Sequence, residues 1–163
     1  MPLDFDKHAQ KGNNFLIRLS AELHDKGNKA RAGKALRAVL RALRDHLTLE
    51  ENFQLLSQLP MALKGVYVDG WVPGRKKERS RKKLGFIMEV ARHKTPAALG
   101  SAAEINAAAS DIQAVFKTLR KYVSAGEFND VRAVLPRQLK ELLEYGVAKA
   151  VTVRRIGKKK IDL

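Results

Sequence analysis

The sequence contains no cysteine, and this absence removes several kinds of chemistry. Disulfides, iron–sulfur clusters, thiolate nucleophiles and cysteine-containing zinc sites all need the sulfur atom. Histidine and carboxylate side chains are present, but the four histidines form no His-x-x-x-His pair and lie in no HExxH motif. These are His8, His24, His46 and His93. We therefore predict no metal site and no cofactor, and structural or surface roles for the histidines.

Long apolar runs and aromatic residues are also scarce. No stretch approaches the roughly 18 consecutive apolar residues of a membrane-spanning helix. The opening MPLDFDKHAQKG lacks the basic and apolar regions of a secretory signal, so we expect a cytoplasmic protein. Apolar residues are 45% of the 163 residues, which is enough for a compact core, but aromatics are only 6%. Leucine, valine and alanine must therefore fill most of that core.

Acidic residues are few relative to basic ones, 17 against 32, and the net charge is +15. The excess is unevenly distributed along the chain. Residues 72–84 carry seven basic residues and one acidic residue, and residues 151–163 carry five and one. Two short segments thus supply +10 of the net charge, while the remainder of the chain is nearly balanced. Such a charge bears on binding partners and not on the fold.

Basic residues at this density attract phosphates, and they touch the nucleic-acid backbone without reading bases. We therefore predict a non-enzymatic protein that binds nucleic acid through its two basic segments, with no small-molecule substrate. The residues are Arg75, Lys76, Lys77, Arg79, Arg81, Lys82 and Lys83 in the middle, and Arg154, Arg155, Lys158, Lys159 and Lys160 at the end. Two alternatives remain open: solvated linker and tail, or weak attachment to an anionic membrane surface through the tail.

The chain also repeats itself. When it is shifted by 76 positions, residues 38–64 align with residues 114–140 without a gap, and nine of the 27 positions are identical. Chance would give about two identities at average residue usage. Upstream, the apolar pattern around Phe15 matches the pattern around Phe86. These matches indicate an internal duplication.

The periodicity of both copies predicts helices. Apolar residues recur at threes and fours over 36–47 and again over 112–123. Thr48 and Ser124 each precede a Glu by three residues, the spacing of a capping box, so each should open a new helix. Prolines follow at 60 and 136 and should break the chain before final helices over 60–67 and 136–148. The one strand-like alternation is at 151–153.

We therefore predict an all-α fold of two tandem, internally duplicated helical-bundle repeats, each with three to four helices, packed as one compact unit. The first repeat covers residues 1–71 and the second covers 85–150. A basic linker that runs into a helix covers 72–84, and a basic C-terminal tail covers 151–163.

Several strings resemble a known family. The opening LDFDKHAQKGNNFL and the stretches ARAGKALRAVLRALRDHLTLEE and QLPMALKGVYVDGW resemble the bacterial domain-of-unknown-function family numbered 2267. The strongest strings are Gln58-Leu-Pro60 and Tyr67-Val-Asp-Gly-Trp71. The resemblance extends over roughly residues 3–145. It implies a duplicated all-helical protein and no assigned activity. The second copy lacks a counterpart of the string that ends at Trp71.

Tyr67 and Trp71 close the first copy, on either side of Gly70. Exposed aromatics there could stack on a base or anchor a protein partner. Alternatively, both rings pack against the second copy and fix the angle between the repeats. The competing function is accordingly a protein-interaction or self-association module that uses these two residues.

The Gly27–Ala35 segment lacks the spacing, the hydroxyl and the preceding strand of a phosphate loop, so we interpret it as a turn followed by a basic helix start.

Overall fold

The computed structural model describes residues 2–74 and 82–142, and this part of the chain contains only helices, turns and connecting segments. The prediction of an all-α fold is confirmed. The strand-like alternation at 151–153 lies outside the described residues. Seven helices and an eighth helical segment over residues 137–142 are described: α1 (Phe5–Glu22), α2 (Lys29–His46), α3 (Leu49–Gln58), α4 (Met61–Val68), α5 (Lys83–Lys94), α6 (Ala102–Tyr122) and α7 (Ala125–Val134).

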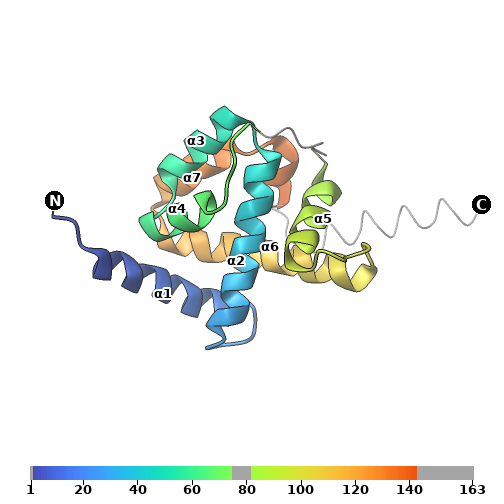
Figure 1. The fold of residues 1–163 in the computed structure, drawn as a ribbon, viewed down its shortest axis with the longest axis horizontal. Helices are drawn as coiled ribbons and strands as arrows, with labels where there is room; N and C mark the ends of the chain where they lie inside the picture. Colours follow the sequence, from blue (N-terminus) through green and yellow to red (C-terminus); the bar gives the residue numbers. More distant parts are fainter. Residues whose placement is uncertain (1, 75–81, 143–163) are drawn as a thin grey trace, which may run out of the picture.

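Helix α2 lies at the centre of the molecule, and α1, α4, α5 and α6 all pack against it (Figure 1). Its buried face carries four alanines among larger apolar residues, and small side chains let neighbouring helices approach closely. The alanines are Ala32, Ala35, Ala38 and Ala42. Leucine, valine and alanine supply most of the core, as the scarcity of aromatics predicts. The first turns of α1 extend outward from the rest of the molecule (Figure 1).

Helices from the two halves of the chain pack across one another. Helix α1 contacts α6, α5 contacts α2, and α3 lies beside α7 (Figure 1). A buried ion pair strengthens the contact of α5 with α6: Lys94 Nζ lies 2.5 Å from Asp111 Oδ2, and the Asp111 side chain is almost fully buried. The two halves therefore share a single core and do not form separate bodies.

Both predicted capping boxes are confirmed, and they explain where α3 and α7 begin. The Thr48 N–H donates to Glu51 Oε2 at 2.8 Å, and the Glu51 N–H donates back to Thr48 Oγ1 at 3.2 Å. Ser124 forms the same reciprocal pair with the third residue of α7. A third box, at Ser101 and Glu104, opens α6 and was not predicted. Each box satisfies N–H groups that a helix start leaves unpaired.

The prolines end helices where the sequence indicates. Helix α3 ends at Gln58, and Pro60 is the N-cap of α4, which begins one residue later than predicted. Pro136 lies directly before the helical segment over 137–142. The predicted continuation of that helix to residue 148 lies outside the described residues.

Candidate anion-binding groove and carboxylate–histidine cluster

Two of the twelve predicted phosphate-binding residues, Lys82 and Lys83, lie within the described part of the chain. Lys82 is exposed and is the N-cap residue of α5, without a side-chain capping hydrogen bond. Lys83 is engaged: its ammonium lies 2.9 Å from Glu141 Oε2, and its backbone N–H donates to Gln138 Oε1 at 2.8 Å. Its side chain is 16% exposed, so it ties α5 to the eighth helical segment.

The other ten predicted residues lie outside the described residues. In the middle segment these are Arg75, Lys76, Lys77, Arg79 and Arg81, and in the tail they are Arg154, Arg155, Lys158, Lys159 and Lys160. For these residues, phosphate binding stays a prediction.

Tyr67 belongs to a buried hydrogen-bond network that holds α4 against α2 and α3. Its side chain is fully buried, and its hydroxyl donates to Asn52 Oδ1. The Asn52 amide nitrogen donates to three backbone carbonyls at the end of α2 and the start of α3. Arg44 donates to the carbonyl oxygens of Tyr67 and Asp69 at 3.1 and 2.8 Å. Burial raises the pKa of Tyr67 and lowers the pKa of Arg44.

Trp71 is half-buried and lies edge-on to two other rings. Its ring centroid is 6.1 Å from that of Phe53 on α3 and 6.4 Å from that of Tyr67. Both ring contacts fall within the first half of the chain. A role for Tyr67 and Trp71 at a partner or repeat interface stays a prediction; of the two, only Trp71 keeps exposed surface.

The structure brings together a basic groove that the sequence did not reveal. The groove runs along α2, has a volume of about 590 Å³, and is lined by two adjacent rows of side chains at i, i+4 spacing. Its cations are Lys29, Lys34, Arg37 and Arg41, and the small residues Ala30, Gly33 and Ala38 lie between them. As predicted, the segment before it is a turn, and α2 begins at Lys29.

The cations of this groove are largely unengaged. Lys29, Lys34 and Arg37 are exposed, and their side chains form no ion pair within residues 2–74 and 82–142. Arg41 is one-third exposed and lies 3.9 Å from an Asp69 carboxylate oxygen. Outside its two basic segments, the chain's charge is nearly balanced. Three exposed groove cations without an anionic partner among the described residues are therefore suited to an anionic ligand.

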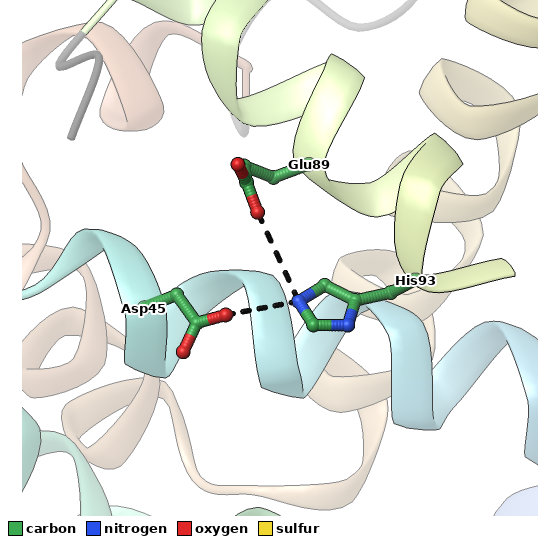
Figure 2. Close-up of side chains that lie close together, drawn as sticks. All are labelled: Asp45, Glu89 and His93. Carbon is green, nitrogen blue, oxygen red and sulfur yellow. Dashed lines mark hydrogen bonds and ion pairs between the residues drawn. The ribbon is translucent and has the colours of Figure 1, made fainter. Parts of the chain in front are cut away.

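Three potential metal ligands converge where the groove meets α5. His93 lines the groove and lies between two carboxylates, Asp45 from the last turn of α2 and Glu89 from α5 (Figure 2). The distance from His93 Nε2 to Asp45 Oδ2 is 3.0 Å, and to Glu89 Oε2 it is 3.9 Å. Glu89 and His93 are one helical turn apart, a spacing readable from the sequence. Asp45 is 48 residues before His93, and only the packing of α5 on α2 adds it.

The contact between α1 and α6 carries a different set of charges. The Glu22 carboxylate lies 2.7 Å from Lys121 Nζ and 3.0 Å from Lys117 Nζ. Hydrogen bonds from Lys121 and Lys117 hold the pKa of Glu22 below its usual value. This contact is an ordinary ion pair, whereas the α2–α5 contact holds three potential ligands.

The comparison with known proteins agrees with the resemblance in the sequence. The family model described as "Uncharacterized conserved protein (DUF2267)" matches residues 12–142, more than half of the chain. The chain belongs to the DUF2267 family. The matched range of this DUF2267 protein includes the groove and the Asp45–Glu89–His93 cluster, whereas the basic tail over 151–163 falls outside it.

Two further findings concern this DUF2267 protein. No curated protein matches its sequence. Among the helices of residues 2–74 and 82–142, none is long and apolar enough to cross a membrane.

Proposed function

We propose that this DUF2267 protein is a non-enzymatic protein that binds the phosphate backbone of nucleic acids without reading base sequence. The observation that carries the proposal is the groove on α2, in which three exposed cations have no anionic partner among the described residues. In this proposal, the basic segments over 72–84 and 151–163 add further phosphate contacts.

The length of the groove fits a strand of several phosphates. Lys29 and Arg41 are twelve residues apart on α2, which corresponds to about 18 Å at about 1.5 Å per residue. Each strand of a duplex carries one phosphate per about 3.4 Å of its axis. Laid along that axis, the row therefore spans about five phosphates of one strand. Lysine and arginine contacts of this kind position the backbone and carry no base information.

The test is fluorescence anisotropy with labelled duplex DNA, single-stranded DNA and RNA, each titrated across salt concentration. Four groove cations predict a slope of log affinity against log salt of about −3.6 from the groove alone. Replacing Lys34 and Arg37 with Gln should make the slope less negative by about 1.8. By the same relation, affinity at 0.15 M salt should fall about 30-fold.

A matched control removes the same charge elsewhere. Lys7 and Arg137 are described residues whose side chains lie outside the groove lining. The Lys7→Gln/Arg137→Gln variant should keep the wild-type affinity within about threefold, because only long-range, screened charge is lost. Equal losses of affinity in the two double variants would mean that only the net charge attracts the nucleic acid. That result would refute the groove as the binding site.

The second candidate function is a protein-interaction or self-association module, and an apolar patch beside Trp71 favours it. Phe53 is 55% exposed and contacts Trp71, and Leu49 lies one turn earlier on α3, also exposed. Val72 extends the patch along the chain and is 56% exposed. A complex that survives high salt and is lost in Phe53→Ser or Trp71→Ala would support this function over nucleic-acid binding.

We also infer that the two halves are duplicated copies of one helical unit. Helices α3 and α7 begin and end 76 residues apart, the offset of the sequence repeat. Ring contacts agree with it: His46 lies edge-on to Phe86 at 5.4 Å, and Tyr122 lies edge-on to Phe15 at 5.1 Å. In each contact, the end of one copy's second helix meets the first helix of the other copy. An experimental structure in which α2–α3 and α6–α7 did not superpose would count against this inference.

A further inference from the structure

We propose that Asp45, Glu89 and His93 bind one divalent transition-metal ion of the zinc or manganese type. Their three ligand atoms all lie within 4.8 Å of one another, and they come from two helices that the fold presses together (Figure 2). This site adjoins the groove through His93, but none of its three ligands is a groove cation, so metal binding and nucleic-acid binding are tested with different variants.

The spacing of the three atoms is close to that of a metal site. A tetrahedral zinc with bonds of about 2.0–2.1 Å holds its ligand atoms about 3.3–3.4 Å apart. The distances from His93 Nε2 to Asp45 Oδ2 and Glu89 Oε2, 3.0 and 3.9 Å, bracket this value. One imidazole with two carboxylates suits borderline divalent metals, and three protein ligands leave a position open for water or a ligand.

The surroundings hold the ligands in place and keep the site reachable. The Asp45 side chain is only 10% exposed, and Glu89 and His93 are 28% and 22% exposed. Arg92 lies 3.5 Å from Glu89 Oε1, which leaves Oε2 directed at His93. His93 also lines the groove, so an ion can enter from solvent there. Without a metal, the Nε2 proton of His93 faces the Asp45 carboxylate. On binding, that proton leaves to solvent, the imidazole carries its proton on Nδ1, and the lone pair of Nε2 goes to the metal.

The α1–α6 contact shows why this cluster differs from an ordinary ion pair. There, two lysine ammoniums already neutralise Glu22. At the α2–α5 contact, by contrast, two carboxylates and one imidazole offer three ligand atoms within 4.8 Å of one another (Figure 2). Most of the protein's other positive charges oppose metal binding only weakly, because charges beyond about 8 Å are screened at physiological salt. Arg92 is an exception, because it lies 3.5 Å from Glu89 Oε1.

The experiment uses the full chain without a histidine tag, in buffer free of phosphate and chelator. Zn²⁺ binding is measured by calorimetry, and Co²⁺ serves as a second probe because its visible absorption reports coordination. We expect one ion per chain. Residues that only surround a metal are worth about 10- to 100-fold in affinity, so loss of a ligand should cost at least tenfold. His93→Gln, Asp45→Asn and Glu89→Gln should each show this loss.

A matched control replaces a histidine away from the cluster. His24 is exposed and has a φ of 57°, a conformation that Asn tolerates well. His24→Asn should therefore bind Zn²⁺ like the wild type. Zn²⁺ should also raise the melting temperature of the wild type and of His24→Asn, but not that of the three cluster variants.

Two outcomes would overturn the proposal: no saturable Zn²⁺ or Co²⁺ binding below about 1 mM, or unchanged binding in His93→Gln and Glu89→Gln. Glu89 provides the safer variant, because within residues 2–74 and 82–142 its carboxylate pairs only with Arg92 and His93, and its side chain is partly exposed. If circular dichroism showed that His93→Gln or Asp45→Asn does not fold, the Zn²⁺ binding of Glu89→Gln would decide. Neither outcome bears on nucleic-acid binding, which is measured separately.

Discussion

Replacing Tyr67 with phenylalanine removes one hydroxyl from the core, and we expect this change to destabilise the protein. The side chain is 0% exposed, and its hydroxyl donates to Asn52 Oδ1, which belongs to a side chain that is 2% exposed. Without the hydroxyl, this buried acceptor loses its donor and cannot reach water. An unsatisfied buried polar group costs about 1–3 kcal/mol. At this chain length, 1 kcal/mol corresponds to about 2–4 °C, so a central loss of about 2 kcal/mol lowers the melting temperature by about 4–8 °C.

The assay is urea and thermal unfolding followed by circular dichroism, with Tyr122→Phe as the matched control. Tyr122 is half-buried, and its hydroxyl has no hydrogen-bond partner within residues 2–74 and 82–142. Its loss should cost less than about 0.5 kcal/mol, as most changes away from buried networks do. Equal effects of the two substitutions, or a Tyr67→Phe loss below about 0.5 kcal/mol, would refute the role given to the Tyr67–Asn52 hydrogen bond.

Two further predictions concern stability. Hydrogen bonds from Lys121 and Lys117 lower the pKa of Glu22, so its ionised form stabilises the fold above its unfolded value near 4.5, and this contribution is lost as pH falls through the folded pKa. Glu22→Gln should therefore flatten the fall in melting temperature below about pH 4.5; an unchanged pH profile would contradict this. Gly100 has a φ of +81°, so Gly100→Ala should cost about 1–2 kcal/mol in urea unfolding. Gly65→Ala, inside α4 with open space at its Cβ, should instead stabilise by about 0.5–1 kcal/mol; the opposite signs would refute the backbone argument.

Much of the fold could be predicted because its signals are local. Apolar residues at threes and fours form one face of each helix, and a capping box satisfies N–H groups only three residues away. The starts of α3 and α7 were therefore readable from Thr48 and Ser124. The Ser101 box at the start of α6 has the same local pattern and was equally readable.

The candidate sites were less accessible, since they depend on which faces meet. The groove cations follow one another at intervals of three to five residues in the sequence, but nothing local shows that a helix face is exposed and unpaired. Glu89 and His93 also lie at i, i+4, yet the cluster needs Asp45, 48 residues away. Conversely, the sequence made Tyr67 a candidate for stacking on a base. Only the tertiary structure shows that its ring is buried and that its hydroxyl donates to Asn52 Oδ1.

The sequence by itself determined the helical class, the helix starts and the break at Pro60, because backbone hydrogen bonding and side-chain periodicity act over a few residues. It also determined the excess of positive charge and the family. Tertiary structure alone decided that α5 packs on α2 and α1 on α6, and therefore that one contact holds an ion pair and the other an Asp–Glu–His cluster. Packing between distant helices depends on the whole set of apolar faces at once, and no single stretch of the chain encodes it.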